Sequence, residues 1–198
     1  MLEPELADGA TPRSIYGFLA AGLAQRRAAG MPGLTLVSCD NLAENGAVLS
    51  GLFSAYLDRV DPGLAAWFGR ECACPSTMVD RIVPAVTDAD RLQIADTIGM
   101  EDAAAVITEP YRQWVIEDDF AGDRPRWELG GAQFVADVAP YETAKLRMLN
   151  GAHSALAYLG LERGHRFVHE AVADPAIRPV VERLMRQEAA RIRNDESA

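Results

Sequence analysis

The residue pattern changes character near Asp137, and this change restricts the fold more than any other feature of the sequence. Before it, short apolar runs with β-branched residues alternate with amphipathic segments, which is typical of an α/β domain. After it, apolar residues recur at helical spacing, with breaks near Gly160–Gly164 and at Asp174-Pro175. We therefore predict an α/β domain over residues 1–136, followed by the start of an all-α domain over residues 137–198.

The α/β part is expected to begin with an amphipathic helix from about Pro12 to Ala29, capped by Thr11. Next comes Leu34–Cys39, a short apolar run typical of a buried parallel strand. It ends in the polar turn Asp40–Gly46, and open α/β sheets bind ligands at such strand ends. The helix is expected to bury a stripe made of Ile15, Phe18, Leu19 and Leu23.

Further elements alternate along the rest of the α/β part. The pattern predicts helices near residues 47–59, from Asp61-Pro62 and from a Thr87 cap to about Thr97. It also predicts a strand or extended segment over Met78–Pro84, a strand over Gln113–Ile116 and a loop over Asp118–Gly131. Three polar residues lie near the predicted strand ends, and each is either a turn residue or a ligand contact. These are Asn41, Asn45 and Asp80.

One lysine stands out against the other basic residues. The chain has 19 bases, and Lys145 is the only one of them that is not arginine. Surface ion pairs accept either residue, but a general base does not, because guanidinium stays protonated while an ammonium group can lose its proton. Lys145 is therefore either a candidate for proton chemistry or a surface lysine without a special role.

Polar residues gather on one arc of the helix predicted after Pro140. At 100° per residue, and with Lys145 at zero, Glu142 lies near roughly 60°, His153 near roughly 80° and Asn150 near roughly 140°. Leucines share this arc, and apolar surroundings favour a neutral amine. The arrangement is explained either by a catalytic site or by an exposed Glu142–Lys145 pair beside an interior histidine.

Charge and hydropathy exclude several classes of partner. The net charge of -10 opposes binding to a phosphate backbone, so we expect no nucleic-acid partner. No apolar stretch reaches the ~20 residues that a membrane span needs, so we expect no membrane partner. Three cysteines without a signal peptide indicate a reduced, cytoplasmic protein. Cys72 and Cys74 lack a second Cys or His pair, so no zinc site is expected.

His165 and His169 have the spacing of a possible metal-binding pair on a helix. No third ligand is evident nearby, and the HExxH order is absent. We favour a solvated or capping role for both, and no metal site is predicted.

Four ordered blocks of sequence resemble the polyol-specific long-chain dehydrogenase/reductase family, which includes mannitol 2-dehydrogenase and fructuronate reductase. The fourth block holds a Lys-x4-Asn-x2-His pattern, and the resemblance covers almost the whole chain. The blocks are Ser38–Leu42 with Asn45-Gly46, Thr77–Ile82 with Pro84, Thr108–Pro110 with Gln113–Asp118, and Tyr141-Glu142 with Lys145, Asn150 and His153-Ser154.

The resemblance implies a metal-independent enzyme that uses NAD or NADP to interconvert a linear polyol or sugar acid and its ketone. It implies that Lys145 is the general base and that Asn41 and Asn150 donate hydrogen bonds to the reacting oxygen. The same resemblance implies that His153 orients the substrate, that Asp80 binds substrate hydroxyls and that Glu142 passes protons between Lys145 and solvent.

The chain also departs from the family pattern. Complete members begin with a Gly-rich βαβ unit, and this sequence has no GxGxxG loop. We therefore expect the later part of a Rossmann-like domain, joined to the start of a helical substrate domain. Two hypotheses follow, which are an oxidoreductase of this family and a truncated, non-catalytic remnant or interaction subunit. A metal hydrolase that uses His165 and His169 is a more distant alternative.

Overall fold

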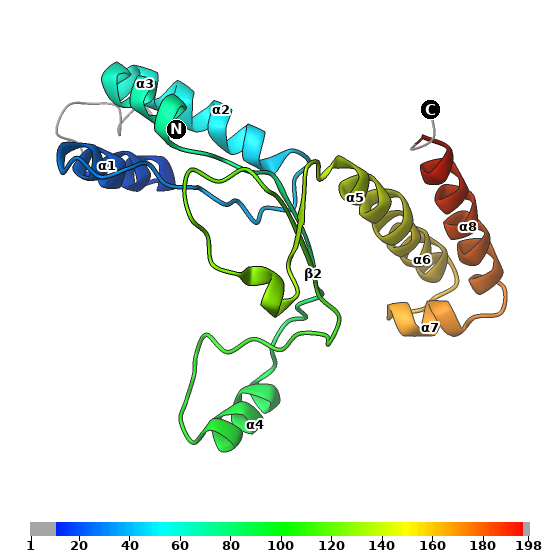
Figure 1. Ribbon diagram of the computed structural model, residues 1–198. Coiled ribbons are helices and arrows are strands. Elements are labelled where there is room, and N and C mark those ends of the chain that lie inside the picture. Colours follow the sequence, from blue (N-terminus) through cyan, green and yellow to red (C-terminus); the bar gives the residue numbers. More distant parts are fainter. Residues whose placement is uncertain (1–10, 196–198) are drawn as a thin grey trace. The chain divides into compact units, whose positions relative to one another are not determined.

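The computed structural model describes residues 11–195, which form two compact units that divide between Ala136 and Asp137. The first unit contains helices and a small sheet, and the second unit contains helices (Figure 1). This observation confirms the predicted order of an α/β part followed by an all-α part. None of the helices in residues 11–195 is both long enough and apolar enough to span a membrane.

Three helices form the core of the α/β unit (Figure 1): α1 (Ile15–Ala28), α2 (Asn45–Val60) and α3 (Pro62–Glu71). The predicted helix start at Asp61-Pro62 is confirmed, and Asp61 caps α3 because its carboxylate accepts the Leu64 N–H at 2.9 Å. The core between the helices is apolar and largely aromatic. Its buried members are Leu23, Leu36, Phe53, Tyr56, Leu57, Leu64 and Phe68.

The predicted face of α1 was wrong at two of its four positions. Ile15 and Phe18 are 63% and 61% exposed, whereas Leu23 is buried. The helix is capped by Ser14 rather than Thr11, and it turns Tyr16 toward the core. Tyr16 stacks on two buried aromatic rings of α2 at centroid distances of 6.3 and 6.0 Å. These aromatic contacts select the helical stripe that contains Tyr16 over the stripe predicted from aliphatic spacing.

The Leu34–Cys39 segment is extended, but it forms only one bridge, from Thr35 to Ala73. The bridge is parallel, as predicted, and the Leu36 N–H donates to the Ala73 carbonyl at 2.9 Å. A longer ladder would need a backbone donor at Pro75, which has no N–H. The predicted buried strand is therefore corrected to a single bridge, and only Leu36 in the segment is buried.

The sheet has three strands in the order β1–β2–β3, with β1 at Thr77–Asp80, β2 at Gln113–Glu117 and β3 at Gln133–Val135. The first pair is antiparallel, and the second pair is parallel. The sequence predicted β2, and it predicted β1 with an end at Pro84 instead of Asp80. It did not predict β3, which has only three residues and no fully buried side chain. Within the predicted loop before β3, the short 3-10 helix η2 covers Trp127–Gly130.

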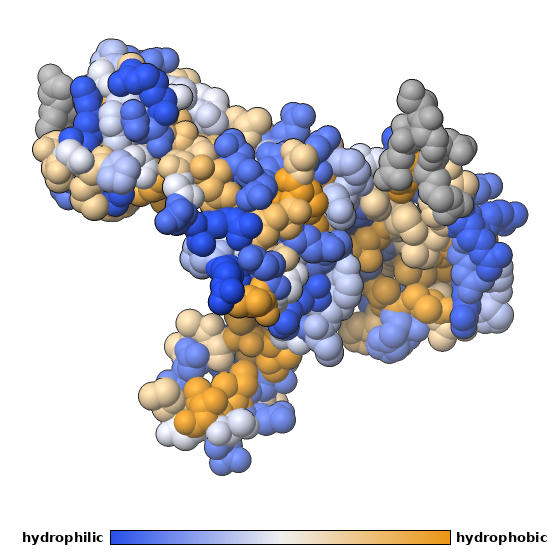
Figure 2. All heavy atoms as spheres, viewed as in Figure 1, coloured by the Kyte–Doolittle hydropathy of each residue, from blue (hydrophilic) through white to orange (hydrophobic). Residues whose placement is uncertain are grey.

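Between β1 and β2 the chain makes a long excursion, residues 81–112, which we call the arm. The arm carries α4 (Asp88–Ile98), capped by Thr87 as predicted, and no residue of α4 is buried. Its base is closed because two nitrogens of Arg81 donate to the Glu109 carbonyl at 3.1 and 3.0 Å. Apolar side chains gather on its surface (Figure 2).

The helical unit begins with one continuous helical segment followed by two more helices (Figure 1). It contains α5 (Ala139–Ala144), the π-helical turn η3 (Lys145–Asn150), α6 (Gly151–Glu162), α7 (Val168–Ala173) and α8 (Arg178–Asp195). The interruptions lie where the sequence predicted them. The buried core of this unit consists of Ala152, Leu156, Ala171, Ile177 and Val181.

Candidate functional site

Asn41 lies in an exposed turn that precedes α2. Glu44, at the end of this turn, has a left-handed backbone with φ of 52°, and it is the only non-glycine residue with positive φ among residues 11–195. Such a conformation persists only where the surrounding structure enforces it. The turn is therefore held in a defined shape by its neighbours.

The side chain of Asn45 fixes this turn through hydrogen bonds. Its side chain is 2% exposed, and its amide nitrogen donates to the Asp40 and Thr77 carbonyls at 2.9 Å each. Its amide oxygen accepts the Thr77 N–H at 2.8 Å. Of the two roles left open by the sequence, a ligand contact is excluded because the side chain is buried and its N–H groups and oxygen already bond protein groups. Asn45 instead fastens the Asn41 turn to the start of β1.

Asp80 ends β1 and lines a cavity of about 400 Å³, which we call the β1–β2 cavity. The rings of Trp114 and Trp127 form part of its wall and stack with centroids 5.2 Å apart. The sequence prediction found Asp80 but missed the other lining residues. The aromatic pair and the Gly130-Gly131 step, which also lines the cavity, are the signals that could have indicated it.

Lys145 and Asn150 are the first and last residues of the π-turn η3. In this turn the Gly151 N–H donates to the Leu146 carbonyl, five residues earlier. The predicted separation of roughly 140° between Lys145 and Asn150 assumed an uninterrupted α-helix and is corrected here. Hydrogen bonds between residues five apart stack position i over i+5, so the π-turn brings Lys145 and Asn150 toward one face.

Glu142 is 8% exposed and lies one turn before the half-buried Lys145. His153 follows on α6 and is exposed. It lines a second cavity of about 400 Å³ with Leu149, Leu156 and Val181, in the helical unit. Glu142, Lys145, Asn150 and His153 therefore share one continuous helical segment, while Asn41 and Asp80 belong to the α/β unit.

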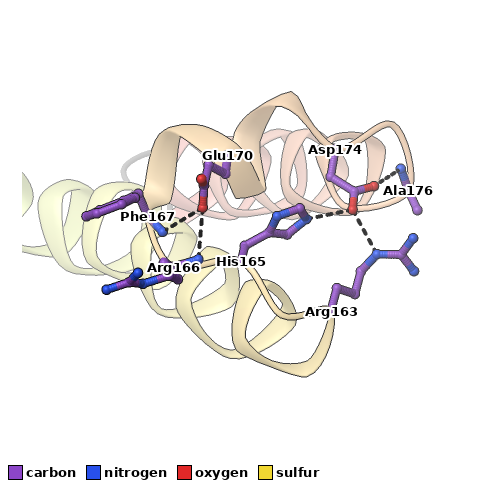
Figure 3. A network of polar contacts seen from close by, with 7 residues as sticks. All are labelled: Arg163, His165, Arg166, Phe167, Glu170, Asp174 and Ala176. Atoms are coloured by element: carbon purple, nitrogen blue, oxygen red, sulfur yellow. Dashed lines mark hydrogen bonds and ion pairs between the residues drawn. The ribbon is translucent and has the colours of Figure 1, made fainter.

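The His165–His169 spacing does not form a helical pair, because His165 precedes α7. Its Nε2 lies 2.9 Å from Asp174 Oδ2, which also accepts from Arg163 Nε at 2.8 Å (Figure 3). His169 instead stacks on the Phe167 ring at 5.5 Å. Within residues 11–195, no cluster of three or more His, Cys, Asp or Glu side chains could hold a metal ion.

The three cysteines are free thiols. Burial raises the pKa of the Cys74 thiol to about 11, and it also raises the pKa values of Cys39 and Cys72. Thiolates, not thiols, act as nucleophiles and metal ligands. These groups are therefore unsuited to either role at neutral pH.

Comparison with known families assigns both units. A model of the mannitol dehydrogenase Rossmann domain matches residues 7–129, and a model of the mannitol dehydrogenase C-terminal domain matches residues 137–195. The chain belongs to the mannitol dehydrogenase family. The resemblance seen in the sequence is thereby confirmed, as is the order of a Rossmann-like domain followed by a helical domain.

Similar members of the mannitol dehydrogenase family are dehydrogenases and oxidoreductases. D-mannonate oxidoreductase of Escherichia coli (strain K12) is 46% identical over 96% of this chain and 39% of its own length. D-arabinitol 4-dehydrogenase of Ralstonia nicotianae is 48% identical over 83% of this chain and 36% of its own length. Pseudomonas fluorescens mannitol 2-dehydrogenase, solved with NAD and D-mannitol, is 44% identical over 93% of this chain and 37% of its own, with a TM-score of 0.80. The chain thus spans less than two fifths of the length of these relatives.

Proposed function

We propose that the chain carries the catalytic cluster of a dehydrogenase that interconverts a secondary alcohol and a ketone on a linear polyol or sugar acid. Family membership and the substrates named for its relatives support this class of reaction. The observation that carries the proposal is the π-turn, which begins at the only lysine and ends at Asn150. Such turns occur frequently at functional sites.

In this proposal Lys145 Nζ takes the alcohol proton during oxidation and returns it during reduction. Hydride leaves the carbon more easily as its oxygen loses the proton, so a base belongs at that oxygen. Glu142, buried one turn earlier, passes the proton between Nζ and solvent. His153 orients the substrate from the next turn of the helix.

Two amides polarise the same oxygen in the proposed mechanism. Asn150, stacked near Lys145 by the π-turn, donates from the helix, and Asn41 donates from the turn before α2. Preorganised donors of this kind stabilise negative charge that develops in a transition state. Asp80, half-buried at the end of β1, accepts hydrogen bonds from other hydroxyls of the substrate.

NAD or NADP, when bound, supplies the hydride acceptor. The exposed turn at residues 40–44 fits the phosphate groups of such a cofactor, because it lies at the N-terminal end of the 16-residue α2. Backbone N–H groups at a helix N-terminus attract anions. The buried amide of Asn45 keeps this end of the turn in a fixed shape.

Substitution of the lysine tests the proposal. We expect Lys145→Ala to lower turnover of the preferred polyol or sugar acid about 100- to 10,000-fold while the Kd for NADH stays unchanged. Lys145→Arg should not restore turnover, because arginine stays protonated at neutral pH. Arg147→Ala, which removes an exposed cation from the same turn, is the matched control and should keep turnover. Near-normal turnover of Lys145→Ala would instead favour the non-catalytic remnant or interaction subunit.

A further inference from the structure

The β1–β2 cavity has a charge opposite to that of the chain. Among its lining residues, Arg81, Arg112 and Arg126 face a single carboxylate, that of Asp80. The chain as a whole carries a net charge of -10. A cavity with excess positive charge on an acidic protein concentrates small anions and raises their rate of binding. Its volume of about 400 Å³ is in the range of small-molecule sites.

Two of the three arginines remain available to a ligand. Arg81 already uses two nitrogens on the Glu109 carbonyl at the base of the arm. No ion pair within residues 11–195 engages Arg112 or Arg126, although the charge of Arg126 is one of the influences that lower the pKa of the exposed Glu128 carboxyl. Arg112 Nε lies 3.9 Å from the position that a Cβ atom at Gly131 would occupy, so the absent side chain leaves one side of the guanidinium open.

The aromatic wall fits the carbon chain of a polyhydroxylated ligand. The stacked rings of Trp114 and Trp127 present apolar surface beside the charged groups. Trp114 Nε1 is the only buried side-chain nitrogen or oxygen within residues 11–195 that lacks a hydrogen-bond partner. Small-molecule sites combine apolar walls with a few polar groups in this way.

We infer that the β1–β2 cavity binds the carboxylate end of a linear sugar acid, with Arg112 and Arg126 as its cationic partners. Guanidinium groups match the planar geometry of a carboxylate and donate two hydrogen bonds to it. Asp80 then takes hydroxyl groups of the same molecule, so the inference rests on the role given to Asp80 in the proposed function. The inference therefore selects a sugar acid from the two substrate classes, polyol and sugar acid, that the proposed function allows.

Tryptophan fluorescence tests this inference directly, because two of the three tryptophans line the cavity. A Trp67→Phe background removes the third. The probes are D-mannonate, D-mannitol and D-mannitol 1-phosphate, which share a carbon chain and differ at one end. We expect D-mannonate to bind at least about tenfold more tightly than either of the others. Equal affinity for D-mannitol, tighter binding of the phosphate, or no response to D-mannonate would overturn the inference.

Variants locate the carboxylate. Arg112→Gln and Arg126→Gln should each weaken D-mannonate about tenfold and leave D-mannitol unchanged. Arg70→Gln, an exposed cation on α3, is the matched control and should change neither. An unchanged D-mannonate affinity in both cavity variants would overturn the inference. Lys145→Ala should still bind D-mannonate more tightly than D-mannitol. A failure of this inference therefore appears as lost binding selectivity, and a failure of the proposed function appears as unchanged turnover in Lys145→Ala.

Discussion

In the α/β unit the position of the exposed Asn41 is fixed by hydrogen bonds that a different residue makes. In the helical unit the position of Asn150 is fixed by the hydrogen bonding of its own helix backbone. The amide of Asn45 reaches Thr77, which is 32 positions away in the sequence, to hold the Asn41 turn. The π-turn holds Asn150 relative to Lys145 within six residues. A group on a loop thus needs tertiary contacts, while a group on a helix needs only a local change of hydrogen bonding.

The largest expected effect comes from breaking the loop's support. Asn45→Ala leaves the buried N–H and carbonyl of Thr77 without their partner, and it also removes the hydrogen bond to the Asp40 carbonyl. We expect the free energy of unfolding to fall by about 3 kcal/mol or more, measured by urea denaturation.

Asn41→Ala is the matched control for that variant. The side chain is exposed, so the free energy of unfolding should change by less than about 0.5 kcal/mol. Turnover should nevertheless fall about 100-fold or more if Asn41 donates to the reacting oxygen. A stable Asn45→Ala protein would show that the turn keeps its shape without the amide.

A one-residue deletion tests the role of the π-turn in the helical unit. Removing Arg147 shortens the π-turn by one residue, which leaves Lys145 and Asn150 four apart, the spacing that stacks in an α-helix. We expect thermal stability, followed by circular dichroism, to stay the same or rise. Deletion of Ala157 from α6 is the control, because it rotates Gly160 by about 100° away from Ala171, which it closely approaches.

The control deletion should lower the melting temperature markedly, and the Arg147 deletion should not. Equal loss in the two deletions would mean that the π-turn is not a one-residue insertion in an otherwise regular helix. Turnover of the Arg147 deletion then shows whether stacking alone is sufficient for the proposed chemistry.

The stability of the two units is expected to respond differently to acid, and this effect is smaller than those of the variants above. Hydrogen bonds from His165, the Ala176 N–H and Arg163 lower the pKa of Asp174 below its ordinary value. A carboxylate with a lowered pKa stabilises the fold above the ordinary carboxyl range, and this contribution is lost as the pH falls from about 4. Asn45 cannot titrate, so its contribution in the α/β unit does not change over the same range.

We therefore expect Asp174→Asn to reduce the acid-dependent part of unfolding in the helical unit. The measurement is thermal melting from neutral pH to about pH 3, compared with the native chain. Identical acid dependence in both proteins would show that other carboxylates control it. Asp174 bonds Arg163 and His165, which precede α7, and the Ala176 N–H, which follows it (Figure 3).

The sequence predicted the order of the two units and most helices, because apolar spacing and capping residues act locally. It mistook the buried face of α1, since the predicted and observed stripes share Leu19 and Leu23. It overextended the Leu34–Cys39 strand, because the interruption comes from Pro75, on the partner segment. The length of this strand could not be predicted locally, because the residue that limits it lies far from it in the sequence.

The residues of the candidate site on the helix could be proposed from the sequence, but the local geometry and the tertiary contacts around them could not. Lys145, Asn150 and His153 followed from their spacing and from the resemblance, but the π-turn did not, since one extra residue in a helix leaves little trace in apolar periodicity. The role of Asn45 requires knowledge that Thr77 lies beside it. The β1–β2 cavity combines residues from three separate segments, and no local pattern joins them.

The arm between β1 and β2 is clamped at its base by Arg81 and Glu109, so the paired strands do not depend on what lies beyond that clamp. The entropy of closing a loop grows only slowly with length, by about 0.6 kcal/mol for each doubling. Related chains can therefore lengthen, shorten or exchange this excursion with little thermodynamic penalty. We therefore expect the arm to tolerate insertions and deletions beyond the clamp, while β1 and β2 keep their pairing.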